Sequence, residues 1–133
     1  MPHHKIRLAR RDIRRMMSRA VARAKGDWEI CGLLIDNGCF LQMRETRNLS
    51  RRRGSCALDF REINAIRRAC EKLDLKIVGT FYSHICSIAK PGRTDIRGAE
   101  DSDLMLIIDS IAKDVGLWRV KNSRAYARAF EMI

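Results

Sequence analysis

Residues 76–84 read KIVGTFYSH, a short run that is mostly apolar and ends on a histidine. Its composition predicts a β-strand. Because strands that are apolar along their whole length are usually covered on both faces, we expect this one near the centre of the sheet. His84 then lies at the carboxyl end of a central strand, which is where α/β sheets usually bind ligands.

Two segments before this strand have the apolar spacing of amphipathic helices. Residues 9–25 carry an apolar stripe at three- and four-residue spacing, and Gly26 ends the pattern. Residues 59–73 repeat the arrangement, so each helix should bury one face against the sheet. The stripes are Ile13, Met16, Met17, Ala20, Val21 and Ala24 in the first segment and Ile63, Ile66, Ala69, Cys70 and Leu73 in the second.

Further strands are predicted on both sides of the central one. Residues 28–46 have the pattern of a hairpin that reverses at Asn37-Gly38, a dipeptide suited to a tight turn. The order of helices and strands predicts an α/β fold with a mixed sheet packed by helices. The remaining strands are expected at residues 5–8, 103–109, 116–120 and 125–133, the last two as antiparallel edge strands.

Length and composition limit the class of protein. The chain has 133 residues, so we interpret residues 1–133 as one domain that includes the basic strand and helix at 5–25. The N-terminus has no apolar signal region and no apolar run reaches the roughly 18 residues of a membrane helix, so no membrane contact is expected. Five cysteines without a C-x-x-C pair are typical of reduced thiols in a cytoplasm.

The formal net charge of +11 is unevenly distributed. Basic residues concentrate in 5–25, where Asp12 is the only acid, and again at Arg51, Arg52 and Arg53. Such a field attracts an acidic protein or a nucleic acid, and it is equally compatible with a solvated surface. Few aromatic residues interleave the arginines, which disfavours a stacking platform for bases.

Three titratable residues occupy unusual places. Glu29 interrupts an apolar strand, His84 ends the central strand, and Asp95 begins a short helix that Thr94 can cap. A buried carboxylate is costly unless it is paired or bound to a metal, so the three are candidates for one concave site. Each also has a structural interpretation: a hydrogen bond for His84, a helix-start charge for Asp95 and an arginine partner for Glu29.

Several motifs occur in an order that is known from one family. They are E-x-C-G-L-L from Glu29, N-L from Asn48, V-G-x-x-x-S-H ending at His84 and P-x-x-T-D ending at Asp95. Over nearly its whole length the chain resembles the JAMM (MPN+) zinc metallopeptidases in their small prokaryotic JAB-domain form. The resemblance implies a three-layer α/β architecture of the cytidine-deaminase-like type.

The resemblance also implies roles for these residues. In this family two histidines and an aspartate hold zinc, and a fourth position is left for water. His84 and Asp95 match the second histidine and the aspartate, and Glu29 matches the general base. Family members cut peptide or isopeptide bonds, often after the tail of ubiquitin or of ubiquitin-like sulfur-carrier proteins.

The sequence departs from the family pattern at three positions. Tyr82 stands at the first histidine position, Gly92 at the position of the oxyanion-stabilising serine, and Ile85 replaces a proline. A phenol ionises only near pH 10, so it is a poor zinc ligand, and losing an oxyanion donor costs on the order of a hundredfold in rate. We therefore expect an impaired or inactive metal site and a binding or scaffold role, with the basic N-terminal helix and the loop at 51–53 as the working surface.

Two alternatives remain open at this point. If the central strand stays extended, Cys86 shares a face with Tyr82 and His84 and could supply the third zinc ligand of an active metallopeptidase; Cys31 could also approach. The other alternative is a basic, nucleic-acid-associated protein, whose binding would fall steeply with salt. The expected partner is a ubiquitin-like or sulfur-carrier tail or another acidic protein, and the sequence does not fix the oligomeric state.

Overall fold

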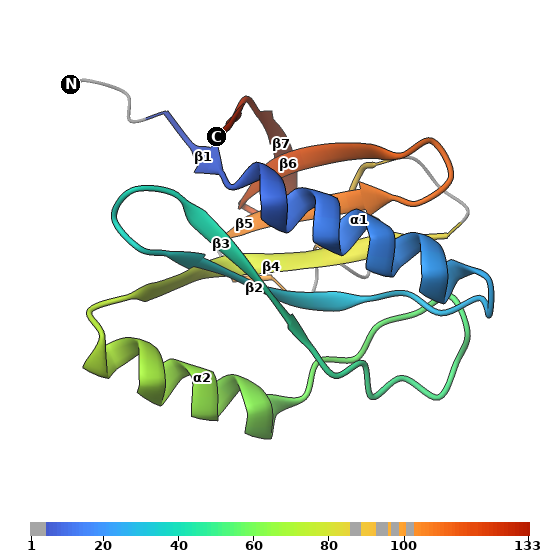
Figure 1. The fold of residues 1–133 in the computed structure, drawn as a ribbon, viewed down its shortest axis with the longest axis horizontal. Coiled ribbons are helices and arrows are strands. Elements are labelled where there is room, and N and C mark those ends of the chain that lie inside the picture. The colour runs from blue at the N-terminus through green and yellow to red at the C-terminus, as the bar shows by residue number, and fades with distance from the viewer. Residues whose placement is uncertain (1–4, 86–88, 93–95, 97–98, 101–102) are drawn as a thin grey trace.

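The computed structural model describes residues 5–85, 89–92, 96, 99–100 and 103–133 (Figure 1). Within these residues, eight strands form one mixed sheet in the order β7-β6-β5-β4-β2-β3-β1-β8. The elements are β1 (Arg7–Leu8), α1 (Arg10–Ala24), β2 (Cys31–Asp36), β3 (Leu41–Thr46), α2 (Phe60–Lys72), β4 (Lys76–His84), β5 (Leu104–Asp109), β6 (Asp114–Lys121), β7 (Arg124–Arg128) and β8 (Glu131–Met132). The predicted α/β class with a mixed sheet is confirmed, and β4 lies between β2 and β5.

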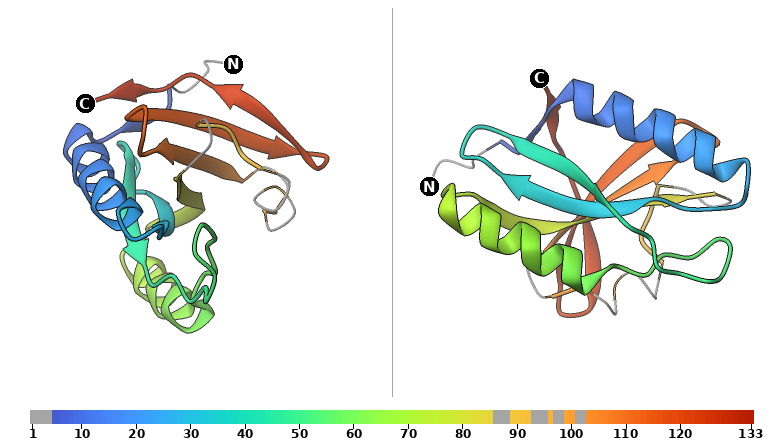
Figure 2. Two further views of the ribbon diagram at one scale, coloured as in Figure 1. Left: turned by 90° about the vertical axis from the view of Figure 1, so that its right-hand side faces the viewer. Right: turned by 60° about the horizontal axis from the view of Figure 1, so that its bottom comes forward.

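The sheet curls so strongly that its two edges are joined by a short piece of chain (Figure 2). Strand β7 forms one edge and β8 the other, and only residues 129–130 separate them. The prediction of one antiparallel edge strand at 125–133 was therefore wrong, because β8 pairs with β1 in parallel. Phe130 packs against the main core between the two strands, and burying that ring draws the chain from one edge to the other.

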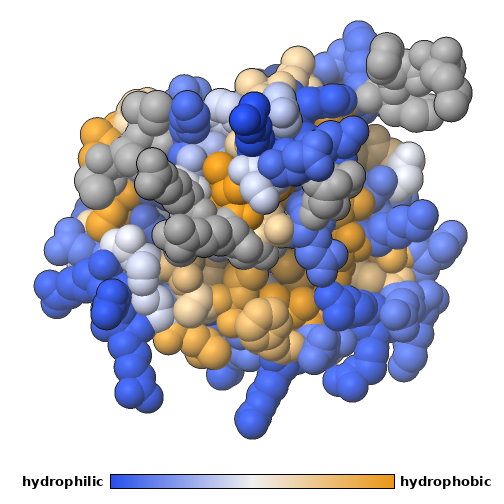
Figure 3. Space-filling model, turned by 180° about the vertical axis from the view of Figure 1, so that it is seen from behind, coloured by the Kyte–Doolittle hydropathy of each residue, from blue (hydrophilic) through white to orange (hydrophobic). Residues whose placement is uncertain are grey.

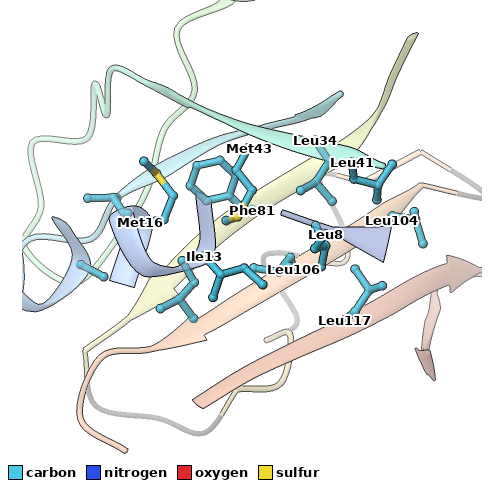
Figure 4. Close-up of a cluster of buried hydrophobic side chains, with 13 residues drawn as sticks. Leu8, Ile13, Met16, Leu34, Leu41, Met43, Phe81, Leu104, Leu106 and Leu117 are labelled. Atoms are coloured by element: carbon cyan, nitrogen blue, oxygen red, sulfur yellow. The ribbon is translucent and has the colours of Figure 1, made fainter. Parts of the chain in front are cut away.

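Helix α1 covers one face of the curled sheet and closes the main core. Ile13 and Met16 on the helix point toward Phe81, which is fully buried on β4 (Figure 4). The predicted stripe is confirmed at Ile13, Met16 and Ala20, which are all buried. The core also draws on leucines from β1, β2, β3, β5 and β6, so the helix holds together strands that are far apart in the sequence.

Helix α2 covers part of the opposite face, which completes three layers. Asp59 caps the helix by accepting from the backbone N–H groups of Arg61 and Glu62. The predicted stripe is confirmed at three positions and wrong at two, since Ala69 and Leu73 are exposed where the helix overhangs the sheet. The buried members are Ile63, Ile66 and Cys70, which pack against Leu33 and Ile35 of β2.

The rest of that face is covered by the segment that follows β4. Met105, Ile107 and Val120 are buried there, and the indole N–H of Trp118 donates to the carbonyl of Ala89 at 3.0 Å. This side of the molecule is turned to the viewer in Figure 3, where apolar residues lie among hydrophilic ones. The helix predicted at 95–103 falls mostly outside the described residues.

The β2–β3 hairpin differs from the prediction in its turn. Strand pairing ends at Asp36 and Leu41, so the connection is longer than the two residues expected at Asn37-Gly38. The side chain of Asn37 accepts from the backbone N–H groups of Cys39 and Phe40 and so replaces strand pairing at the tip. No described helix is long and apolar enough to cross a membrane.

A buried carboxylate joins α1 to the edge of the sheet. Asp12 is 5% exposed, and its Oδ2 accepts from the backbone N–H of Met43 on β3 at 3.1 Å. Arg15 lies 3.5 Å from the other oxygen. Strand β3 pairs with β1 only at Leu41, so the aspartate satisfies a backbone group that has no strand beside it.

We expect Asp12→Ala to lower the free energy of unfolding by about 1–3 kcal/mol, because it leaves the buried N–H of Met43 without an acceptor. Urea unfolding followed by circular dichroism measures the change. Glu71→Ala, which removes an exposed carboxylate from α2, is the control and should stay within about 0.5 kcal/mol of the parent protein. Equal unfolding midpoints for both variants would contradict this role of Asp12.

Candidate functional site

The candidate site lies where β2 begins and β4 ends. Just before β2, the backbone N–H of Ile30 donates to the Oγ of Ser83 at 2.7 Å, and the N–H of Ser83 donates to the carbonyl of Ile30 at 2.9 Å. This double contact extends the antiparallel register of the two strands by one residue. Glu29, which precedes Ile30, therefore lies across from His84, and each of the two side chains is 9% exposed.

Four side chains share one face at this end of the sheet. Cys31 lies opposite Tyr82 in the strand register, and opposed residues in a sheet point to the same side. Because side chains alternate along a strand, Glu29 and His84 lie on that same face. The structure thus brings together Glu29, the His84 predicted as a metal ligand, and the tyrosine at the first histidine position.

The neighbouring strand β5 fixes the end of β4. The carbonyl of His84 accepts from the Oγ of Ser110 at 3.1 Å and from its backbone N–H at 3.3 Å. Asp109 lies beside His84 in the parallel register and is buried, but its Oδ1 accepts from the N–H groups of Ile111 and Ala112. This carboxylate, which the sequence analysis did not single out, therefore has a structural role in closing the β5–β6 turn.

Tyr82 lies in an apolar environment. It is partly buried and packs into the cluster on the face opposite α1. The ring occupies a packing position at the place where the resemblance implies a metal ligand. Its neighbours in that cluster are Met105, Ile107, Ala89, Ile96, Ala99, Trp118 and Val120.

One asparagine holds the loop between β3 and α2 against the site. The amide of Asn48 donates to the carbonyls of Glu29, at 3.0 Å, and Ser55, at 2.9 Å. Its Oδ1 accepts from the backbone N–H groups of Ser50 and Ala57, each at 3.0 Å. Asn48 thus ties both ends of this loop to the backbone of Glu29, a role that the sequence marked only through the N-L motif.

Two thiols meet beside Glu29. A hydrogen bond with the Cys56 thiol lowers the pKa of Cys31, and the same bond together with burial raises the pKa of Cys56. The nearby carboxylate of Glu29 adds to the rise in the pKa of Cys56, and the Cys56 thiol donates to the carbonyl of Ile30 at 3.5 Å. No sequence pattern indicates this pair, because the two cysteines lie on different segments and match no metal or redox spacing.

Two hollows flank the sheet at opposite ends. A hollow of about 450 Å³ lies beside the candidate site and is lined by Glu29, Asn48 and Glu62, among others. A larger one of about 980 Å³ lies at the far end, around Asp36 and Leu104. Only the smaller hollow adjoins the residues that the sequence singled out.

The three predicted surface arginines are exposed. Arg51, Arg52 and Arg53 form the tip of the loop that Asn48 anchors. Arg53 lies 4.0 Å from Asp27, an exposed pair that contributes little to stability. The basic loop is therefore held by the hydrogen bonds of Asn48 to backbone groups at its base, and the guanidinium groups of Arg51, Arg52 and Arg53 face solvent.

Three of the other predicted residues lie after β4. Asp95 and Cys86 are outside the described residues. Gly92, at the position of the lost serine, is exposed, and its carbonyl accepts from the N–H of Ile96 at 3.1 Å. A glycine offers no side-chain donor at that position.

Solved structures share this architecture. The solution structure of protein DSY2949 from Desulfitobacterium hafniense is similar with a TM-score of 0.77 and 25% identity, covering 96% of this chain and 91% of that one. The crystal structure of AF2198, a JAB1/MPN domain protein from Archaeoglobus fulgidus, is similar with a TM-score of 0.63 and 12% identity, covering 96% and 99%. The chain has a JAMM/MPN-like fold.

A third structure points to the same fold. It is described as a JAMM metalloprotease-like zinc site in the proteasome and signalosome, and it is similar with a TM-score of 0.58 and 12% identity, covering 98% of this chain and 99% of that one. No protein-family model matches the chain, and no curated protein matches it in sequence. At these identities the likeness to JAB1/MPN structures establishes the fold alone.

The described residues do not supply the zinc-binding set that a JAMM-like fold implies. Among them, no three His, Cys, Asp or Glu side chains converge as metal ligands. Of the implied set, His84 is in place and Tyr82 offers a phenol within an apolar cluster. We therefore assign no chemical step to a metal at this site.

We expect Asn48→Ala to release the loop between β3 and α2, because it removes four hydrogen bonds to backbone groups at the loop's base. Trypsin should then cut the folded protein after Arg51–Arg53 faster than in the parent, as followed by mass spectrometry. Asn64→Ala on α2, where the side chain accepts only a 3.4 Å bond from exposed Arg67, is the matched control. Equal cleavage of the two variants would show that Asn48 does not anchor the loop.

Proposed function

We propose that this JAMM/MPN-like chain is a binding module with an impaired metal site, and that it holds an extended protein tail of ubiquitin-like or sulfur-carrier type. The observation that carries the proposal is the placement of Tyr82. Its ring packs with Met105 and Ile107 on the face where the fold's zinc ligands are expected. An aromatic ring at this position contributes to packing, and a neutral phenol holds zinc poorly.

The surroundings of the site suit a protein ligand. The hollow beside Glu29 is lined mainly by polar and charged residues and adjoins the segment before β2 and the end of β3. Arg19, Arg23 and Arg47 line it, and the exposed arginines 51–53 lie on the loop that Asn48, another lining residue, anchors. These guanidinium groups complement an acidic surface or the carboxylate that ends a protein tail. We assign the tail's contacts to this loop and the end of β4.

A zinc-dependent peptidase with a substituted ligand is the second candidate. Cys31 lies opposite Tyr82 on the same face, and its hydrogen bond with Cys56 lowers its pKa, which favours the thiolate that zinc binds. In this alternative Cys31 or Cys86 would join His84 and Asp95, and Glu29 would act as the general base. The two candidates differ in zinc content, which can be measured directly.

We expect Tyr82→His to raise the affinity for zinc by roughly ten- to a hundredfold or more, because it restores the ligand that the fold implies. Mass spectrometry of untagged protein, purified without a chelator and titrated with zinc, measures the change. Tyr126→His, which places a histidine on the exposed edge strand β7, is the control for added imidazole and should bind as the parent does.

Two outcomes would overturn the zinc argument. Stoichiometric zinc in the parent protein that is lost in His84→Ala would favour the substituted peptidase, with Cys31→Ser and Cys86→Ser as the next variants. No gain of zinc in a folded Tyr82→His variant would mean that this end of the sheet does not preserve the ligand geometry. His3 and His4 are replaced in every variant, because they add background binding.

We expect ubiquitin to bind the parent protein more tightly than ubiquitin lacking its C-terminal tail, as measured by fluorescence anisotropy. Replacing Arg51, Arg52 and Arg53 by glutamate should weaken binding by roughly tenfold. A matched charge change on α2, at the exposed residues Arg61, Arg67 and Arg68, should have a much smaller effect. Equal losses in both triple variants would indicate nonspecific attraction, and tighter, salt-sensitive binding of single-stranded DNA would favour the nucleic-acid alternative.

A further inference from the structure

We infer that the larger hollow, of about 980 Å³, binds a small organic anion in which a phosphate or carboxylate is joined to a flat ring, as in a nucleoside phosphate. This hollow lies at the end of the sheet opposite the candidate site. The inference therefore holds whether or not the proposed tail binds there. Neither the fold nor the resemblance assigns a role to this end of the molecule.

The hollow lies within the curl of the sheet that Figure 2 shows. Each of the strands β1 to β7 contributes a residue to its lining. Its floor is apolar, because Leu41 and Leu104 belong to the main core, and in Figure 4 both lie at the opposite end of that core from Met16. Its volume is within the roughly 300–1,000 Å³ of small-molecule pockets, which often occupy the mouth of a curled sheet.

Two arginines lie on one wall of this hollow. Strand pairing places Arg119 of β6 opposite Leu104 and Arg128 of β7 opposite Leu117. Both leucines point into the main core, so both arginines lie on the same, concave face of the sheet. Arg128 is exposed and forms no ion pair with an acid of the described part of the chain. Two guanidinium groups on one wall are suited to a phosphate or a carboxylate.

Aromatic rings lie close to these arginines. The chain has few aromatic residues among its arginines, but residues 124–128, RAYAR, place a tyrosine between two of them. Tyr126 pairs with Arg119 in the strand register, so it lies on the concave face, and it is 50% exposed. Phe40, which is half-buried in the β2–β3 connection, lines the hollow itself. Either ring offers a face on which a flat ligand can stack.

Two acids in the lining favour a small ligand over a nucleic acid. Asp36 and Asp103 each use one carboxylate oxygen to accept a backbone N–H, from Gly38 at 2.8 Å and from Glu100 at 3.0 Å. The second oxygen of each can accept from a sugar hydroxyl or a ring amino group. A chain of phosphates would be repelled by both carboxylates, whereas a single phosphate on the arginine wall is not forced against them.

The remaining cations of the lining have a partner of their own. Lys5 and Arg7 lie 2.9 Å and 3.6 Å from the carboxylate of Glu131, where β8 closes the sheet. We therefore assign the ligand's anionic group to Arg119 and Arg128, and its ring to Phe40 and the apolar floor.

The test is a titration of the isotope-labelled full chain with adenosine monophosphate, followed through the chemical shifts of backbone amides. We expect saturable shifts at Gly38, Leu104 and Arg119, and none at Asn48 or Cys56 beside the candidate site. Adenosine and inorganic phosphate, titrated separately, should each bind roughly tenfold more weakly or worse, because each lacks one of the two contacts.

Variants separate the two contacts. Arg128→Gln should weaken binding of adenosine monophosphate by roughly tenfold, because it removes a charged donor. Arg124→Gln, on the same strand and the same face but outside the lining, is the matched control and should stay within about twofold of the parent. Phe40→Ala should weaken binding of the nucleotide and leave binding of inorganic phosphate unchanged, whereas Phe60→Ala, at an exposed position on α2, should change neither. Circular dichroism confirms that each variant is folded.

Several results would overturn the inference. They are the absence of saturable shifts, shifts that centre on the loop carrying Arg51–Arg53, and equal binding of phosphate and nucleotide. Equal affinities of folded Arg128→Gln and Arg124→Gln would also overturn it. Tighter binding of a single-stranded oligonucleotide, with shifts along α1, would replace the small-ligand site by a nucleic-acid surface.

Discussion

The antiparallel pairing of β2 with β4 is the constraint on which the rest of this structure depends. It joins the β3 side of the sheet, which carries α1 and α2, to β5, β6 and β7. The strands on either side of this pair also lie close to it: a Cβ on Gly32 of β2 would lie 2.1 Å from the carbonyl oxygen of Arg44 on β3, and one on Gly79 of β4 would lie 1.9 Å from that of Leu104 on β5. Adjacent backbones can therefore approach closely only because these side chains are absent.

The same pairing decides what meets at the candidate site. The register runs without a shift from the middle of the strands to the contact between Ile30 and Ser83. Ser83 is fully buried, and its hydroxyl accepts a hydrogen bond from the backbone N–H of Ile30 just beyond the last residue pair of the two strands. Because of this hydroxyl the chain keeps its direction for one more residue, and Glu29 faces His84. A one-residue slip of β2 here would move Glu29 and Cys31 to the other face, away from Tyr82 and His84.

Local patterns in the sequence predicted those helices and strands whose buried residues recur at the regular spacing of a helix or a strand. The central strand and both helices follow from apolar spacing that lies within a few residues. The cap by Asp59, which was predicted only as the first residue of its helix, is equally local. The β8–β1 pair, the Asp12–Met43 bond and the meeting of Cys31 with Cys56 join distant segments, and no local rule fixes which segments meet. The position of Asp12 is nevertheless unusual in the sequence. It lies four residues before the buried Met16, on the inward side of a helix whose other charges are basic.

The environment of Glu29 shows how this fold accommodates a buried carboxylate. A carboxylate that is nine-tenths buried needs donors close to it, and in a zinc enzyme the metal-bound water is one of them. Here the Cys56 thiol lies near Glu29, and Asn48 holds the backbone beside it. Tyr82 packs in an apolar cluster, and Glu29 lies beside groups of the loop, so the described surroundings of both side chains are made by the protein itself. The loop that supplies those neighbours also carries the exposed arginines, so the contacts that stabilise the buried acid position the surface that we assign to binding.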